Sequence, residues 1–157
     1  MSNSTIDAGG VLIQKKPRSL YKHLGNGDSC NFNSKAGGVS LLYNEKYANN
    51  PNYNHDINNL IENIAFLEAN KADYVVIAPA NIITTMDYED VIENHEKTGA
   101  EITMVYKKVH DANEAYIGCD CLTIKDKVVT AVERNKGSRK DRSISLETYV
   151  IYTKTLL

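Results

Sequence analysis

The sequence lacks an excess of either charge, long apolar runs and a secretory start. Its 18 basic and 20 acidic residues leave a formal net charge of −2, which gives the whole chain no attraction to nucleic acid or an anionic membrane. The purely apolar runs are a few residues long, far below the roughly 20 that cross a bilayer. Residues 1–10 have neither the basic start nor the apolar stretch of a signal peptide. We expect a cytoplasmic protein without nucleic-acid or membrane partners.

Cysteine is also scarce. The three cysteines form an odd set without framework spacing. Cys119 and Cys121 stand two apart on an expected strand, so their side chains face the same side. We interpret them as small core residues. The alternative, a pair of metal ligands, lacks a second Cys or His pair at suitable spacing.

The chain is organised around residues 72–106. An uninterrupted apolar run over 74–78 predicts a strand buried on both faces of a parallel sheet. Asp87 is the expected N-cap of the helix that follows, with an inner stripe at Tyr88, Val91, Ile92 and His95, and Gly99 ends it. Residues 102–106 then form a second apolar strand, which completes a βαβ unit.

The remaining segments alternate strand and helix first and are mostly strand afterwards. Residues 56–69 predict one helix capped by Asp56, because apolar residues recur at helical spacing. These inner positions are Ile57, Leu60, Ile61, Ile64 and Leu67. The other expected elements are a helix over 18–24, strands over 10–14, 39–43, 116–124, 128–132 and 146–152, loops over 25–37 and 44–54, a charged turn at 125–127 and a basic loop over 134–142. We therefore predict a single α/β domain with a mixed, Rossmann-like sheet and flanking helices.

Pattern alone gives weak catalytic signals. Ala8-Gly9-Gly10 precedes a strand, whereas phosphate-binding glycine loops follow one, so we interpret it as a flexible lead-in. The four histidines have no obvious nucleophile or metal partner, and His95 is interpreted as a packing residue rather than a base. The basic loop over 134–142 is interpreted as a solvated hairpin tip, with an anion site as the alternative.

Several phrases, in the same order along the chain, resemble bacterial glucose-1-phosphate adenylyltransferases (ADP-glucose pyrophosphorylases). Tyr116-Ile117-Gly118 is similar to the family's Phe-Gly-Val, and Ser145-Leu146-Glu147-Thr148-Tyr149-Val150 to its Ser-Met-Gly-Ile-Tyr-Val. The other matching phrases are Ser2-Asn3…Ile6, the segment GGVLIQKKPRSLYKHLG, Met86-Asp87-Tyr88 with Gly99-Ala100, and Val132-Glu133-Arg134-Asn135, which resembles Val-Glu-Lys-Pro. Pro17-Arg18-Ser19-Leu20-Tyr21, Gly25-Asn26-Gly27 and Leu146-Glu147 most resemble the family's non-catalytic partner subunit of glycogen biosynthesis.

The resemblance implies a fold of the nucleotide-diphospho-sugar transferase type and a set of sugar-phosphate contacts. These contacts fall on Tyr53, Gly118, Glu133, Arg134 and Ser145. Arg134 replaces a lysine, so a flat guanidinium fork takes the place of a point charge. The loop after Tyr53 does not follow the family pattern.

The resemblance is weaker for the residues that bind the nucleotide and the metal ion in the family. The family's Gly-Asp after its buried strand aligns with Ala80-Asn81, and that Asp supplies a carboxylate to Mg²⁺. A neutral amide has no charge to offer, although Asn81 also suits a plain turn. The glycine-rich loop that opens the family domain would precede Met1, and the C-terminal β-helix would follow Leu157. We therefore expect residues 1–157 to form a partial domain, incomplete at both ends, which associates through unpaired strand edges.

These expectations lead to one function with two alternatives. The first is a regulatory partner subunit of glucose-1-phosphate adenylyltransferase, with a sugar-phosphate pocket, a catalytic subunit as partner, no catalytic residues and no cofactor. The second is an active adenylyltransferase that makes ADP-glucose from ATP and glucose 1-phosphate and needs Mg²⁺. The third is an assembly domain without a ligand.

Overall fold

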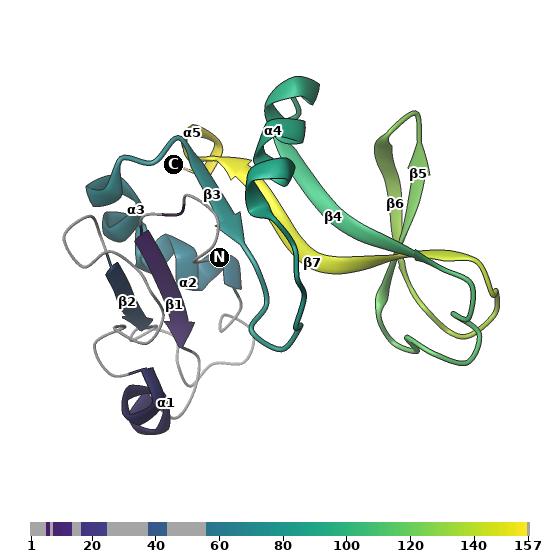
Figure 1. The fold of residues 1–157 in the computed structure, drawn as a ribbon, viewed down its shortest axis with the longest axis horizontal. Coiled ribbons are helices and arrows are strands. Elements are labelled where there is room, and N and C mark those ends of the chain that lie inside the picture. The colour runs from purple at the N-terminus through teal and green to yellow at the C-terminus, as the bar shows by residue number, and fades with distance from the viewer. Residues whose placement is uncertain (1–5, 7, 14–16, 25–37, 44–55, 157) are drawn as a thin grey trace. The chain divides into compact units, whose positions relative to one another are not determined.

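The computed structural model describes residues 6, 8–13, 17–24, 38–43 and 56–156 (Figure 1). The chain divides into two compact units. Residues 1–73, 87–89 and 157 form the first unit, and residues 74–86 and 90–156 form the second. Among the described strands, each unit has a sheet of its own.

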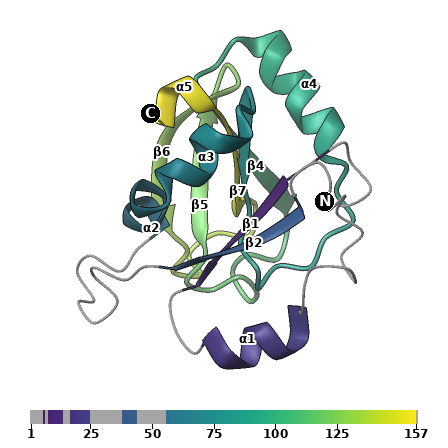
Figure 2. The ribbon, with the colours of Figure 1, turned by 90° about the vertical axis from the view of Figure 1, so that its left-hand side faces the viewer.

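The first unit contains a parallel strand pair and three described helices. Strand β1 (Ala8–Ile13) pairs with β2 (Gly38–Tyr43) from Ala8↔Gly38 to Ile13↔Tyr43 (Figure 2). The helices are α1 (Pro17–Leu24), α2 (Asp56–Glu62) and α3 (Ile64–Asn70). Proline at the first position of α1 is favourable because that residue needs no N–H partner. The predicted strand over 10–14 is confirmed as far as Ile13, and the strand over 39–43 and the helix over 18–24 are confirmed. The predicted loops over 25–37 and 44–54 lie outside the described residues.

The single helix predicted over 56–69 is wrong, because the helix breaks at Asn63. The Asn63 amide Nδ2 donates to the carbonyl oxygens of Asn59 at 2.8 Å and Tyr43 at 3.0 Å. Asparagine side chains compete in this way with helical backbone hydrogen bonds. The predicted inner residues Ile57 and Ile61 are 54% and 57% exposed, whereas Leu60 is buried.

The glycines of Ala8-Gly9-Gly10 lie within β1, so their interpretation as a flexible lead-in is wrong. A Cβ atom added to Gly10 would lie 2.7 Å from Leu42 Cδ1 and 3.0 Å from Phe66 Cε1. Glycine here permits the close approach of β1 to its neighbours.

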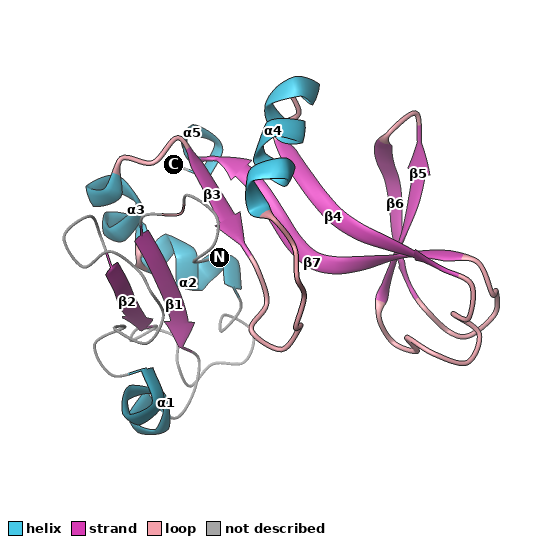
Figure 3. Cartoon of the chain, viewed as in Figure 1, coloured by secondary structure: helices cyan, strands magenta, loops and turns pink. Residues whose placement is uncertain are grey.

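The second unit contains an antiparallel sheet in the order β3-β7-β5-β6, with β4 also paired to β7 (Figure 3). Its strands are β3 (Tyr74–Ile77), β4 (Ile102–Val109), β5 (Asp120–Lys125), β6 (Val128–Arg134) and β7 (Arg142–Tyr152), followed by helix α5 (Thr153–Leu156). The predicted parallel setting of the run over 74–78 is wrong. Strand β3 pairs antiparallel with β7, which lies between β3 and β4 and buries Val150 and Ile151.

Helix α4 (Tyr88–Thr98) follows the sequence prediction closely. Asp87 Oδ1 accepts a hydrogen bond from the Glu89 N–H at 3.0 Å, which is an N-cap. Gly99 has a φ of 63° and donates to the His95 carbonyl at 3.1 Å, so it ends the helix in the left-handed conformation. Tyr88 and His95 are buried on the inner stripe.

A small apolar cluster lies where β4, β5 and β7 meet. Val109, Ala112, Cys121 and Ile144 form it, and Cys119 packs against it. The interpretation of both cysteines as core residues is confirmed, and burial raises the pKa of the Cys121 thiol. None of the described helices combines the length and apolar character needed to cross a membrane.

A bulge interrupts the pairing of β4 with β7. Val105 pairs with Thr148 and Tyr106 with Ser145, which leaves Leu146 and Glu147 as extra residues in β7. Glu147 has a φ of 51°, a conformation that glycine adopts most readily. In the family phrase that this segment resembles, glycine stands at the same place.

We expect Glu147→Val to lower the free energy of unfolding by about 1–2 kcal/mol, because a β-branched residue is strained at positive φ. Glu147→Gly should be tolerated, and Thr123→Val at an exposed strand position is the matched control. Chemical denaturation measures all three variants. Equal stability of Glu147→Val and the wild type would contradict the assigned backbone conformation.

Candidate functional site

Four of the five predicted sugar-phosphate contacts lie in the second unit. Tyr53 lies outside the described residues. Gly118 is in the turn before β5, Glu133 and Arg134 end β6, and Ser145 is in β7. Because β5 pairs with both β6 and β7, these residues come together at one end of three neighbouring strands.

The strand register separates three of these residues onto two faces. Cys121 on β5 pairs with Glu133 on one side and with Ile144 on the other. One residue further along, Arg134 pairs with Asp120, and Ser145 follows Ile144. Successive strand side chains alternate between faces. Arg134 and Ser145 therefore share one face, and Glu133 lies on the opposite one.

Gly118 lies beside the chain that leaves β6. Its N–H donates to the Asn135 carbonyl at 2.9 Å, and the Asn135 N–H donates to the Cys119 carbonyl at 2.8 Å. With a φ of 83°, Gly118 occupies a conformation that disfavours other residues. The turn that carries Gly118 is thus tied directly to the residue after Arg134.

Arg134 is exposed and, within the described part of the chain, forms no ion pair or side-chain hydrogen bond. The loop that follows adds the exposed cations Lys136, Arg139 and Lys140. Residues 133–142 carry five basic and two acidic side chains, and Asp120 pairs with Arg134 across the strands, so this end of the sheet has an excess of positive charge. A guanidinium with unused donors in such a field can bind a phosphate through a pair of charge-assisted hydrogen bonds.

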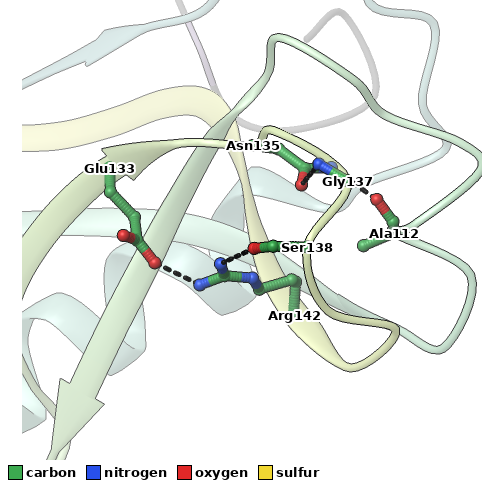
Figure 4. A network of polar contacts seen from close by, with 6 residues as sticks. All are labelled: Ala112, Glu133, Asn135, Gly137, Ser138 and Arg142. Atoms are coloured by element: carbon green, nitrogen blue, oxygen red, sulfur yellow. Dashed lines mark hydrogen bonds and ion pairs between the residues drawn. The ribbon is translucent and has the colours of Figure 1, made fainter.

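Glu133 is engaged by Arg142, a contact that the sequence did not reveal. Arg142 Nη1 donates to Glu133 Oε1, and Nη2 lies 3.5 Å from Ser138 Oγ (Figure 4). The Arg142 side chain is only 11% exposed. Its hydrogen bond and charge hold the pKa of Glu133 below the ordinary value. The alternation of side chains along a strand could have indicated this contact. Arg142 lies two residues from Ile144 and therefore on the same face as Ile144 and Glu133.

Replacing Arg142 with glutamine should raise the pKa of Glu133, because it removes both the charged donor and the nearest cation. The pKa can be followed by an NMR titration of the Glu133 side-chain carboxyl. Arg139→Gln is the control and should give a smaller rise, since Arg139 acts on Glu133 only through its charge. A Glu133 titration that is the same in Arg142→Gln and wild type would contradict the ion pair.

Ser145 is buried, and its hydroxyl supports the bulge of β7. Ser145 Oγ accepts from the Glu147 N–H at 3.1 Å. The side chain is 6% exposed. Ser145 therefore shapes the strand next to the face that carries Arg134.

Asn81 lies in the turn after β3 and is exposed. It presents an uncharged amide where the family resemblance expects a carboxylate. Among the described residues, no three His, Cys, Asp or Glu side chains lie close enough together to hold a metal ion. The amide oxygen of Asn81 is a weaker ligand for Mg²⁺ than the oxygen of a carboxylate.

His95 is a packing residue, as predicted. It is fully buried, and its Nδ1 lies 2.7 Å from Thr103 Oγ1. Its ring centroid lies 4.6 Å from that of Tyr152 and 5.9 Å from that of Tyr74. Burial lowers the pKa of the imidazole below its ordinary value of 6.5, although the Glu96 charge opposes the shift.

Solved structures with the same fold cover nearly the whole chain. A Bacillus anthracis protein assigned as a glucose-1-phosphate thymidylyltransferase aligns with a TM-score of 0.66 at 12% identity, over 94% of this chain and 53% of its own. HddC from Yersinia pseudotuberculosis aligns with a TM-score of 0.67 at 15% identity, over 97% and 59%. The chain thus has the mixed α/β fold of these proteins.

Sequence comparison then identifies the family. The model of the family described as nucleotidyl transferase matches residues 1–151. The chain belongs to the nucleotidyl transferase family. It is 32% identical to the glucose-1-phosphate adenylyltransferase of Clostridium perfringens strain SM101, over 99% of this chain and 40% of that protein. It is 31% identical to the protein of the same name from Lachnospira eligens, over 98% and 36%. The chain thus spans about two fifths of the length of these relatives.

Proposed function

We propose that this chain binds a sugar phosphate of the glucose 1-phosphate class and acts as a non-catalytic partner of glucose-1-phosphate adenylyltransferase in glycogen biosynthesis. One observation carries the proposal. An exposed Arg134 without an ion pair among the described residues stands beside the Gly118 turn, while the turn after β3 presents an uncharged Asn81.

The binding half of the proposal rests on Arg134 and its surroundings. Its guanidinium would hold the phosphate, and the three cations of the following loop would raise the local anion concentration. Gly118 lies beside Arg134 in the fold, and Ser145 shares the face that carries Arg134. Glu133 would not take part directly, because Arg142 holds it on the opposite face.

The non-catalytic half rests on Asn81. Transfer of an adenylyl group from ATP needs charge neutralisation on the leaving pyrophosphate, which Mg²⁺ supplies in this class of chemistry. An amide oxygen offers one weak ligand without negative charge. A chain that binds sugar phosphate without this chemistry can still regulate a catalytic partner, provided that its affinity differs between the partner's conformations.

Calorimetric titration of the purified chain with glucose 1-phosphate tests the binding half. We expect saturable binding that weakens at higher ionic strength, because the main contact is between charged groups. Galactose 1-phosphate tests whether the sugar is recognised. Glucose, which lacks the phosphate, tests whether the phosphate is required. If glucose 1-phosphate produces no heat of binding, the result would favour an assembly domain without a ligand.

Co-purification tests the partner half. A tagged catalytic adenylyltransferase subunit from the same cell should retain this chain on a column and shift its elution in gel filtration. We then expect this chain to change how the rate of the catalytic subunit depends on the sugar-phosphate concentration. Separate elution of the two proteins at micromolar concentration would contradict the partnership.

A further inference from the structure

Asn135 is a buried amide that connects two loops at the binding end of the sheet. It directly follows Arg134 and is 1% exposed. Its Nδ2 donates to the carbonyl oxygens of Ala112 at 2.8 Å and Tyr116 at 2.9 Å, with Ala115 at 3.3 Å. Its Oδ1 accepts from the Gly137 N–H at 3.0 Å (Figure 4). Both ends of the amide are therefore used.

The two connected loops are the β4–β5 loop (residues 110–119) and the β6–β7 loop (residues 135–141). The Ala112 N–H also donates to the Lys140 carbonyl at 3.0 Å. The loops fit closely, since a Cβ atom on Gly137 would lie 3.1 Å from the Asn113 carbonyl oxygen. Asn135 is thus one of the polar links that hold the two loops together.

The β4–β5 loop needs such links because its backbone is strained. Tyr116 has a φ of 57° and Gly118 one of 83°. A non-glycine residue in this region costs on the order of 1–3 kcal/mol and persists only where its surroundings hold it. The Asn135 amide holds the Tyr116 carbonyl, and the Asn135 main chain bonds to Gly118 and Cys119.

We propose that Asn135 is a positioning residue that sets the Gly118 turn relative to Arg134, and that it thereby determines the preference for a sugar phosphate over inorganic phosphate. This inference rests on the proposed function. Arg134 would hold the phosphate from β6, whereas the sugar would contact the Gly118 turn. Loosening the turn should weaken sugar recognition while leaving the phosphate contact in place.

Asparagine is specifically suited to this position. Aspartate keeps an acceptor for Gly137 but has no donor for the Ala112 and Tyr116 carbonyls when ionised. Proline, which stands here in the family phrase that this segment resembles, has neither a side-chain amide nor an N–H for Cys119.

The test compares Asn135→Ala with Asn113→Ala by calorimetric titration with glucose 1-phosphate and with inorganic phosphate. Asn113 makes the matched control, because within the described part of the chain its amide reaches only the neighbouring Glu114 carboxylate, at 3.4 Å. We expect Asn135→Ala to raise the Kd for glucose 1-phosphate about tenfold, which corresponds to about 1.4 kcal/mol. The Kd for inorganic phosphate should change less than twofold, and Asn113→Ala should match the wild type.

Asn135→Asp provides a second test if the alanine variant fails to fold. Its buried carboxyl should have a raised pKa and regain one O–H donor when protonated. Relative to wild type at the same pH, its affinity for glucose 1-phosphate should be low at pH 8 and partly restored at pH 5.5. The affinity for inorganic phosphate should not show this pH-dependent change, whereas a loss of folded protein would weaken the binding of both ligands together.

The outcomes separate this inference from the proposed function. Unchanged glucose 1-phosphate affinity in both Asn135 variants, or equal weakening of both ligands, would overturn the positioning role alone. Failure of the wild type to bind glucose 1-phosphate would overturn the proposed function and this inference together. Selective loss of sugar-phosphate affinity, with wild-type behaviour of Asn113→Ala, would support both.

Discussion

Replacing His95 with alanine is expected to lower the free energy of unfolding by about 3 kcal/mol, as for other large buried side chains. The imidazole is fully buried, contacts the rings of Tyr74 and Tyr152 and bonds to Thr103. Truncation would leave a cavity between α4 and the sheet and an unpaired Thr103 hydroxyl. Chemical denaturation measures the loss.

The same residue should make stability depend on pH. Among the described residues, His95 Nε2 has no hydrogen-bond partner, and burial lowers the folded-state pKa. Glu96, the next residue of the same helix, accepts a hydrogen bond from the Tyr74 hydroxyl at 2.7 Å, and its charge opposes this shift only in part. The unfolded state then binds more protons below pH 6.5. Stability should be complete above that pH and fall below it, by at most about 1.4 kcal/mol per pH unit.

His95→Phe should flatten this pH dependence, because it retains an aromatic ring and removes the titrating group. His110→Ala is the matched control, since His110 is exposed and its side chain bonds to the exposed Asp141 carboxylate. A wild-type stability that stays constant from pH 7 to pH 5, or a slope that survives in His95→Phe, would contradict a neutral buried imidazole.

Replacing Arg134 with alanine is expected to weaken glucose 1-phosphate binding at least tenfold. Hydrogen bonds to charged groups contribute about 1.5–3 kcal/mol, which corresponds to roughly 10- to 150-fold in Kd. Arg134→Lys should recover part of the loss, because it retains the charge but not the two-pronged geometry. Calorimetry at fixed ionic strength measures these differences.

The control for Arg134 is Arg139→Ala, which removes one cation from the following loop. It should change affinity only slightly and mainly at low salt, where long-range charge has most effect. Equal losses in Arg134→Ala and Arg139→Ala would indicate a diffuse electrostatic attraction in place of a defined site.

Local sequence patterns predicted helix α4 and its two ends well. The stripe from Tyr88 to His95, the Asp87 cap and the Gly99 stop all lie within one short segment, so local residue types determine them. The turn over 125–127 is equally local, with positive φ at Asp126 and Lys127 as a tight hairpin requires. Such features need no knowledge of distant partners.

The features that sequence reasoning missed depend on contacts between distant segments. Asn63 ends a helix because its amide reaches Tyr43, 20 residues earlier. The apolar run of β3 cannot reveal whether its partner is parallel, and β7 turns out to be antiparallel. Hydrophobic patterning indicates burial but leaves strand direction open.

The candidate site also combines residues that the sequence indicated with contacts that it did not reveal. The family resemblance pointed to Arg134 and Gly118, which the strand register brings together. It gave no indication that Arg142 would hold Glu133 or that Asn135 would connect two loops. Those roles come from β7 and from the β4–β5 loop, whose positions follow from the folded sheet.

The most direct test of the account is ADP-glucose formation by the purified chain with ATP, glucose 1-phosphate and Mg²⁺. With Asn81 at the turn after β3, we expect glucose 1-phosphate to bind while no ADP-glucose or pyrophosphate appears above the enzyme-free rate. Mg²⁺-dependent formation of ADP-glucose that is lost in Asn81→Ala would contradict the non-catalytic assignment.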